Sequence, residues 1–260
     1  MSRPLYVEAC IRTDLDALWE ATQDPARHQR WDLRFTEIQY LRSPDAGPQQ
    51  FRYGVRVLGI RLSGTGVCTG ERRRADGSRT SALRFASPHP LSLLAEGSGY
   101  WRYVPTDGGD GAGGGAGVRF LTGYDYRPRW GRCGRFADRV LFRPLMGWAT
   151  AWSFDRLRLW LERGATPEQL RRRALAEAAA RAVAVAATGV LTSYAVAFVG
   201  LITLLLLPPL PGTPAARRCV RRRPDSVTAP AILDRLEPLD RPERLKPLDR
   251  IDRLEPEAAS

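Results

Sequence analysis

A run of 25 residues without a charged side chain, from Val183 to Leu207, constrains this chain more than any other feature. Uncharged apolar runs of about 18 or more residues are typical of membrane-spanning helices. A helix of this length measures about 38 Å, against a hydrocarbon core of about 30 Å. The alternative, a buried core helix, needs a larger surrounding core than this chain offers. The sequence therefore predicts a single transmembrane helix at 183–207.

The distribution of charge divides the rest of the chain around this run. Residues 163–223 carry ten arginines against two glutamates, whereas 224–260 hold more acidic than basic side chains. We expect a folded domain at 1–163, a basic juxtamembrane helix at 164–182, and a basic, then low-complexity and disordered tail at 208–260. Arginines beside an apolar run suit anionic lipids better than nucleic acid. The arginines expected to contact lipid headgroups are Arg171, Arg172, Arg173 and Arg181.

The N-terminus carries no apolar segment of the kind that marks a signal peptide. A folded domain of this size is hard to export through a helix that follows it in the chain. Five arginines precede the run and five follow it, so their count does not set the orientation. We therefore expect a single-pass protein of the cell membrane with its folded domain in the cytoplasm and its tail on the far side.

Small residues recur within the run. Gly189, Ser193 and Ala197 are four residues apart, and Gly200 follows three residues later. Such a stripe lets helix backbones approach, so it predicts a weak homodimer. The alternative is that small residues are simply common in membrane helices.

Periodicity within residues 1–163 predicts a mixed α and β domain. Asp14 and Asp24 supply the caps of two short helices, and apolar spacing predicts a long helix at 134–163 with a kink or restart at Pro144. The glycine-rich segment 108–117 joins two predicted strands, so it favours a hairpin loop over a nucleotide-binding loop. Period-two alternation predicts strands at 5–12, 35–41, 51–57, 62–72, 80–85, 97–104 and 118–126.

This order of elements, with Trp19, Asp24-Pro25 and Trp31 near the start, resembles the START-like superfamily (SRPBCC, polyketide cyclase/dehydrase type). The stretches Gly117–Thr122 and Leu157–Glu162 add to the resemblance, which covers about residues 3–163. It implies an α+β helix-grip fold, in which a curved antiparallel sheet surrounds a long C-terminal helix and leaves an apolar cavity. Members include lipid carriers and cyclases, so the resemblance does not fix a reaction.

Alternating strand positions and the long helix supply the candidates for lining such a cavity. Ordinary core packing is the alternative for any one of them. As a group, we expect the following residues to bind a hydrophobic ligand: Trp31, Phe51, Tyr53, Val55, Phe85, Trp101, Tyr103, Phe120, Tyr124, Trp148 and Trp152.

Residues that would indicate catalysis are few. His28 and His89 lack metal-ligand spacing and are expected at the surface or in turns, while Asp32 and Glu96 have no partner in the sequence. No serine or cysteine lies in a nucleophile motif, and no metal or cofactor is expected. The sequence favours a membrane-anchored binding or transfer module for a hydrophobic small molecule or lipid over an enzyme. The alternatives are a polyketide cyclase/dehydratase-like enzyme and a membrane adaptor that acts through its tail.

Overall fold

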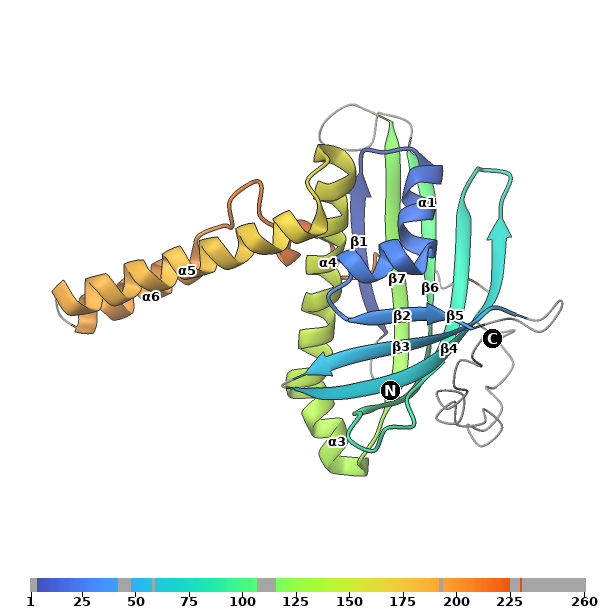
Figure 1. Cartoon of the computed structure of the whole chain (residues 1–260), viewed down its shortest axis with the longest axis horizontal. Helices are drawn as coiled ribbons and strands as arrows, with labels where there is room; N and C mark the ends of the chain where they lie inside the picture. Colours follow the sequence, from blue (N-terminus) through green and yellow to red (C-terminus); the bar gives the residue numbers. More distant parts are fainter. Residues whose placement is uncertain are drawn as a thin grey trace, which may run out of the picture.

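The structure is a computed structural model with one curved antiparallel sheet, a long helix against it, and a helical arm that projects from the domain (Figure 1). The sheet order is β1-β7-β6-β5-β4-β3-β2, so the first strand pairs with the last and the second lies at the opposite edge. The residues that the structure describes are 4–41, 48–57, 59–106, 116–191, 194–224 and 230.

All seven strands predicted from alternation are present. Residues 107–115 lie outside the described part, but the strands on either side of them are antiparallel neighbours, as expected for a hairpin. The strands are β1 (Leu5–Ile11), β2 (Glu37–Tyr40), β3 (Gln50–Val57), β4 (Ile60–Arg73), β5 (Arg79–Ala86), β6 (Leu94–Thr106) and β7 (Gly117–Pro128).

The helices of the domain begin where capping chemistry places them. The Asp14 carboxylate accepts from the Ala17 amide at the start of α1 (Leu15–Gln23), and Asp24 caps α2 (Pro25–Trp31) in the same way. After β7, α3 (Gly131–Ala137) passes through a π-helical turn, η1 (Asp138–Phe142), into α4 (Arg143–Arg163). Pro144 lies at the first turn of α4, directly after the π-helical turn, so the expected kink or restart corresponds to a local change of helix type in a continuous helical path.

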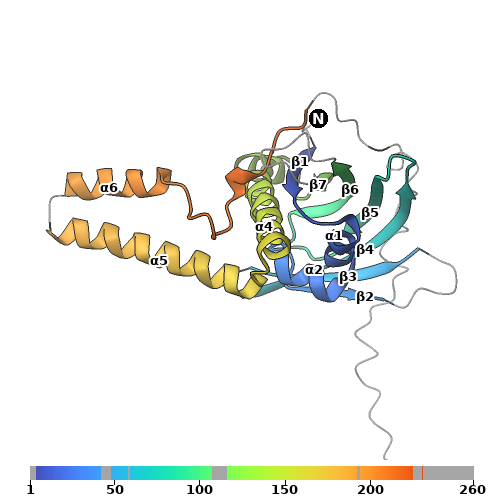
Figure 2. The same cartoon turned by 90° about the horizontal axis from the view of Figure 1, so that it is seen from above.

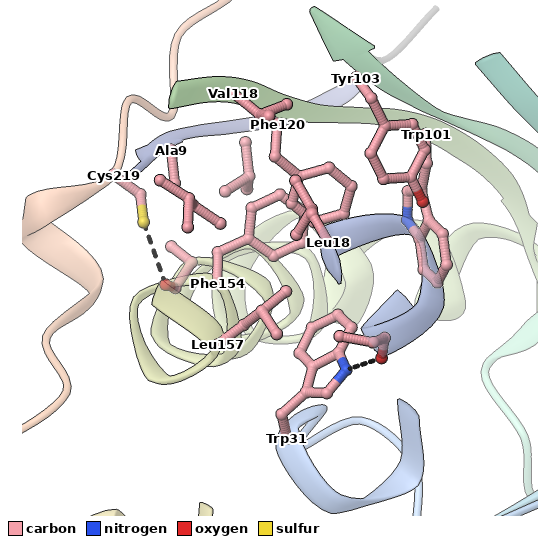
Figure 3. Close-up of a cluster of buried hydrophobic side chains, with 14 of the residues drawn as sticks. Ala9, Leu18, Trp31, Trp101, Tyr103, Val118, Phe120, Phe154, Leu157 and Cys219 are labelled. Atoms are coloured by element: carbon pink, nitrogen blue, oxygen red, sulfur yellow. Dashed lines mark hydrogen bonds between the residues drawn. The ribbon is translucent and has the colours of Figure 1, made fainter. Parts of the chain in front are cut away.

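The main core lies between β1, β6 and β7 on one side and α1 and α4 on the other (Figure 3). The Phe120 ring of β7 stacks on the Phe154 ring of α4, with centroids 4.4 Å apart. Trp31 is fully buried, and its indole N–H donates to the Ala21 carbonyl at 2.9 Å. These contacts join both short helices and α4 to the sheet, and the result is the helix-grip arrangement.

The predicted continuous helix at 183–207 is not formed. Two helices occupy this part of the chain, α5 (Pro167–Leu191) and α6 (Tyr194–Leu206), and they lie side by side with opposite directions (Figure 2). Among the described residues, the structure contains no helix whose length and apolar character would allow it to cross a membrane. The prediction rests on the apolar character of the side chains alone. A change of chain direction within an apolar run leaves that character unchanged, so the sequence pattern does not detect it.

The start of α5 and part of the small-residue stripe have defined contacts. The Thr166 hydroxyl and the Gln169 amide group cap each other's backbone, which is the capping-box arrangement typical of Thr-x-x-Gln at a helix start. A side chain placed on Gly200 would lie 4.0 Å from the Thr188 methyl group of α5, so this glycine faces the other helix of the same chain. Ser193 falls outside the described residues, and the homodimer stays a prediction.

After α6 the chain returns to the folded domain, which the sequence did not predict. Residues 213–220, named the strap here, contact α4 and β1. The buried Asp155 carboxylate accepts from the Ala215 amide and the Arg218 guanidinium, both at 2.8 Å. Cys219 is buried in the main core, where its thiol donates to the Ala151 carbonyl (Figure 3). The strap therefore belongs to the fold, whereas 231–260 of the expected tail lie outside the described residues.

Candidate functional site: an apolar cavity with a buried ionic group

A cavity of about 350 Å³ lies between the sheet and the first half of α4. Pockets that hold small molecules measure about 300–1,000 Å³ and are lined mainly by apolar side chains. Strands β3 to β7, the connection between α2 and β2, and α4 all contribute to the lining. The cavity is therefore large enough for a small molecule, and its walls come from segments distant in sequence.

Most of the residues predicted to bind a ligand border this cavity. Tyr103, Phe120 and Trp31 do not, because α1, α2 and α4 cover them in the main core, and Trp152 packs against that core as well. Their expected place at the cavity is thus corrected. Those that line it are Phe51, Tyr53, Val55, Phe85, Trp101, Tyr124 and Trp148.

Two glycines of β4 make room for aromatic rings in the cavity wall. Tyr53 of β3 pairs with Gly64 and Phe51 pairs with Gly66 across the strands. A Cβ atom built on either glycine would lie 2.2 Å from the ring of its partner, far inside van der Waals contact. The rings therefore lie directly against the β4 backbone, where a larger residue would push them into the cavity.

The wall of the cavity includes an ionic group that the sequence did not predict. The Asp32 carboxylate accepts from Arg34 through Nη2 at 2.6 Å and through Nε at 3.0 Å. It also meets Nε2 of His28 at 3.1 Å, and the Asp32 side chain is fully buried. His28 and Arg34 both line the cavity, so a charged pair and an imidazole border a space that is mainly apolar.

The charge states of this group follow from burial and proximity. Burial alone would raise the pKa of Asp32, but the Arg34 guanidinium and the His28 hydrogen bond outweigh it, so this pKa lies far below its usual range. Burial lowers the pKa of His28, and Asp32 opposes this only in part. The group therefore consists of a carboxylate, a guanidinium and a neutral imidazole at neutral pH.

Arg34 borders the cavity and is held by several neighbours. An arginine has five N–H donors, of which the side-chain bonds to Asp32 use two. Its guanidinium carbon also lies 5.4 Å from the ring centre of Phe35 and 5.5 Å from that of Tyr124, as expected for a cation held over aromatic faces. The Tyr124 hydroxyl is 2.9 Å from that of Thr150, so it is already paired within the wall.

The mouth of the cavity lies where its lining reaches the surface. Leu33, in the connection between α2 and β2, is 44% exposed, and Leu145 and Trp148 of α4 are 52% and 43% exposed. All three line the cavity. Because these side chains reach both the cavity and the surface, they indicate an entrance between that connection and α4.

The ionic group had a local signal in the sequence. His28 is not a surface residue, because its ring contacts Trp31, Phe35 and Trp101 and its side chain is 12% exposed. Histidine and aspartate four residues apart at the end of a short helix, with arginine two residues later, favour such a group. By contrast, His89 lies in a turn as expected, where its Nδ1 accepts from the Leu91 amide.

Comparison with known proteins gives one clear relative. No protein-family model matches the chain. The chain is 48% identical over 174 residues to a protein of Bacillus subtilis (strain 168) named uncharacterized membrane protein YndG, and the match covers 66% of this chain and 62% of that protein. This chain thus matches less than two thirds of the relative's length.

Two solved structures show weaker similarity. One is a STAR-related lipid transfer protein fragment from Xanthomonas axonopodis, at 16% identity and a TM-score of 0.42, covering 60% of this chain and 84% of that one. The other is the Zhui aromatase/cyclase from Streptomyces sp. R1128, at 16% identity and a TM-score of 0.37, covering 60% and 96%. Scores of this size leave the function to be inferred from the chain's own cavity and charges.

Proposed function

We propose that this chain is a membrane-associated module that binds a hydrophobic small molecule or lipid with an anionic or hydrogen-bond-accepting end. The observation that carries the proposal is the mainly apolar cavity with Arg34, paired to Asp32, in its wall. The apolar body of the guest would contact the aromatic and aliphatic side chains that line the cavity. Its polar end would accept from Arg34, where a charge-assisted hydrogen bond is strongest because water is excluded.

Association with a membrane is supported by observations outside the cavity. The Bacillus subtilis relative is named a membrane protein. Arg171, Arg172 and Arg173 are exposed on α5. Arg181 lies about two turns further along the same helix. We propose that these arginines contact anionic lipid headgroups, which would hold the cavity close to a store of apolar ligand.

The cavity is tested by filling it in the full chain. Val55→Trp should reduce binding of a fluorescent fatty-acid probe by about tenfold or more, because an added ring occupies the space that the probe needs. The matched control is Val140→Trp on η1, since Val140 is 61% exposed and does not line the cavity. Unchanged binding by a folded Val55→Trp protein would contradict the proposal.

The polar end is tested with the same probe and its methyl ester. Because Arg34 is paired in the interior, the variant replaces both partners, Asp32→Asn with Arg34→Gln, which avoids an unpaired buried charge. Affinity for the acid should fall by about tenfold, the loss of one charge-assisted hydrogen bond, while affinity for the ester should stay the same. An equal loss for both probes would place the polar end elsewhere.

The enzyme alternative is favoured by one observation, the His28 ring beside the cavity with its Nε2 held on the buried Asp32. An imidazole oriented by a carboxylate is a common arrangement for proton transfer. If a polyketide-like substrate is converted by the full chain, His28→Asn should abolish turnover and leave substrate binding within about twofold. Turnover that survives this substitution would remove the enzyme proposal.

A further inference from the structure

The helices α5 and α6 form an apolar hairpin that projects from the domain (Figures 1 and 2). No residue from Ala182 to Ala216 carries a charge. Val183 on α5 is 68% exposed, and Phe198 and Val199 on α6 are 64% and 62% exposed. Exposed apolar surface on this scale marks a contact with another apolar phase.

Two threonine hydroxyls in the described part of the hairpin are paired within their own helices. The Thr188 hydroxyl donates to the Ala184 carbonyl at 2.8 Å, and the Thr203 hydroxyl donates to the Val199 carbonyl at 2.9 Å. Backbone groups in the interior of a helix are also paired internally, so these two hydroxyls and the helical backbone around them meet the condition for entering a lipid phase.

The base of the hairpin is held together by a polar clamp. Arg181 of α5 donates to the carbonyls of Leu207 and Pro208 at 3.0 and 2.9 Å, just after α6 ends. Glu177 accepts from Arg181 at 2.6 Å and from the Leu210 amide at 3.2 Å. These bonds fix the end of α6 beside the charged half of α5, so both arms of the hairpin begin at the same level.

The strap then fixes the returning chain to the domain. Val220 exchanges both backbone hydrogen bonds with Glu8 of β1, each 2.9 Å long. Ala215 and Arg218 share the buried carboxylate of Asp155, and Cys219 is buried in the core. A helix that crossed a membrane at 183–207 would carry the strap to the far side and break every one of these contacts.

The dimensions of the hairpin agree with partial entry. The part of α5 beyond Arg181 contains ten residues and α6 contains 13. At about 1.5 Å per residue these segments measure about 15 and 20 Å, against about 30 Å for a hydrocarbon core. The arms therefore reach about one half and two thirds of the way through the hydrocarbon core, and neither crosses it.

The charges complete the match to a lipid surface. All ten arginines of 163–223 lie before Ala182 or after Ala216, on the domain side of the uncharged hairpin. In a spanning helix five of them would lie on each side, whereas the hairpin gathers all ten at one surface. A collar of arginines around the base of an apolar insertion complements the anionic headgroups of one leaflet.

We infer that α5 and α6 insert into one leaflet as a hairpin, so that the folded domain and the chain after the strap lie on the same side of the membrane. This rests on the proposed membrane association and specifies its geometry. Lipid acyl chains would contact the exposed apolar faces of both helices, and the arginines on either side of the uncharged segment would remain at the headgroups.

Sidedness is tested with the full chain carrying Ser260→Cys, in sealed membrane vesicles of both orientations and a membrane-impermeant maleimide. The native Cys133 is exposed on α3 and reports the domain, and mass spectrometry reads each labelled peptide. We expect both thiols to be labelled in one orientation and both protected in the other, with full labelling in detergent. Labelling of one thiol and protection of the other would overturn the hairpin while leaving membrane association intact.

Insertion is tested with vesicles of phosphatidylglycerol and phosphatidylcholine. Phe198→Glu should lower vesicle binding by about tenfold or more, because a carboxylate near the middle of the hairpin would enter hydrocarbon. The matched control is Leu175→Glu on α5, which is also 64% exposed but lies on the domain side of Arg181, and it should change binding less than about twofold. Equal effects would overturn the insertion, and an absence of vesicle binding by the unmodified chain would remove the membrane association while leaving the cavity proposal untouched.

Discussion

The folded domain and the α5–α6 hairpin treat the same residue type in opposite ways. Phe154 of α4 is fully buried and stacks on Phe120, whereas Phe198 of α6 is 64% exposed. Both lie on helices rich in apolar residues. The difference shows that an apolar helix pattern indicates a surface that is stable only when it is shielded from water. The pattern does not say which part of the molecule, or which other phase, shields it.

Charge follows the same contrast. The domain buries the charges of Asp155 and Asp32 only with arginine partners, as the cost of desolvation requires. The hairpin has no charged side chain between Ala182 and Ala216. The two regions therefore differ in composition as well as in exposure. The proposed insertion accounts for this, because a protein interior can supply partners for a buried charge and a lipid phase cannot.

The sharpest test of this comparison removes one ring from each region. Phe154→Ala should lower the free energy of unfolding in solution by about 3–5 kcal/mol, because it leaves a cavity in the core. Phe198→Ala should change it by less than about 0.5 kcal/mol, as for other exposed positions. Chemical denaturation of both variants measures the difference, and a large effect of Phe198→Ala would show that the ring is covered by protein.

The strap can be loosened without altering the hairpin itself. Asp155→Asn should cost about 2–3 kcal/mol of stability, because Arg158 and Arg218 lose a charged acceptor that is fully buried. The strap should also become more sensitive to limited proteolysis than the sheet. Asp125→Asn is the control, since that carboxylate is 45% exposed and pairs with Arg143 at the surface.

The ionic group of the cavity predicts a dependence of stability on pH. Burial lowers the pKa of His28 in the folded state, whereas in the unfolded chain this histidine has its ordinary pKa of about 6.5. At a pH near or below 6.5, the unfolded chain therefore binds more protons than the folded chain. Stability should therefore fall as the pH decreases from 6.5 towards 5, by at most about 1.4 kcal/mol per pH unit for this one residue.

The control for this pH effect is His28→Gln, which removes the titrating ring. Its unfolding free energy should vary less between pH 6.5 and 5 than that of the unmodified chain, whatever its absolute stability. The same slope in both proteins would assign the pH dependence to other groups.

The smallest expected effect lies at the junction of the two regions. Thr166→Ala removes the hydroxyl that accepts from the Gln169 amide at the start of α5. Loss of an N-cap costs about 1 kcal/mol, and here it should appear as faster amide hydrogen exchange in the first turn of α5. Thr166→Ser keeps the hydroxyl and should exchange like the unmodified chain.

The features that the sequence determined by itself are local ones, which depend on residues close together in the chain. The seven strands follow from alternation, the starts of α1 and α2 from Asp14 and Asp24, and the irregular turn before α4 from Pro144. The capping box at Thr166 and the uncharged run are likewise visible in the sequence. Such features are local because cap bonds and side-chain period involve residues only a few positions apart.

The tertiary structure alone decided how distant segments meet. It selected the aromatic residues that line the cavity, since Tyr103 and Phe120 have the same alternation as Trp101 but are covered by α1 and α4. It also returned the chain after α6 to the domain, where Ala215 binds Asp155 across 60 positions of sequence. A reversal within an uncharged run leaves no periodic trace, so only the contacts of the strap and the clamp reveal that the run is a hairpin.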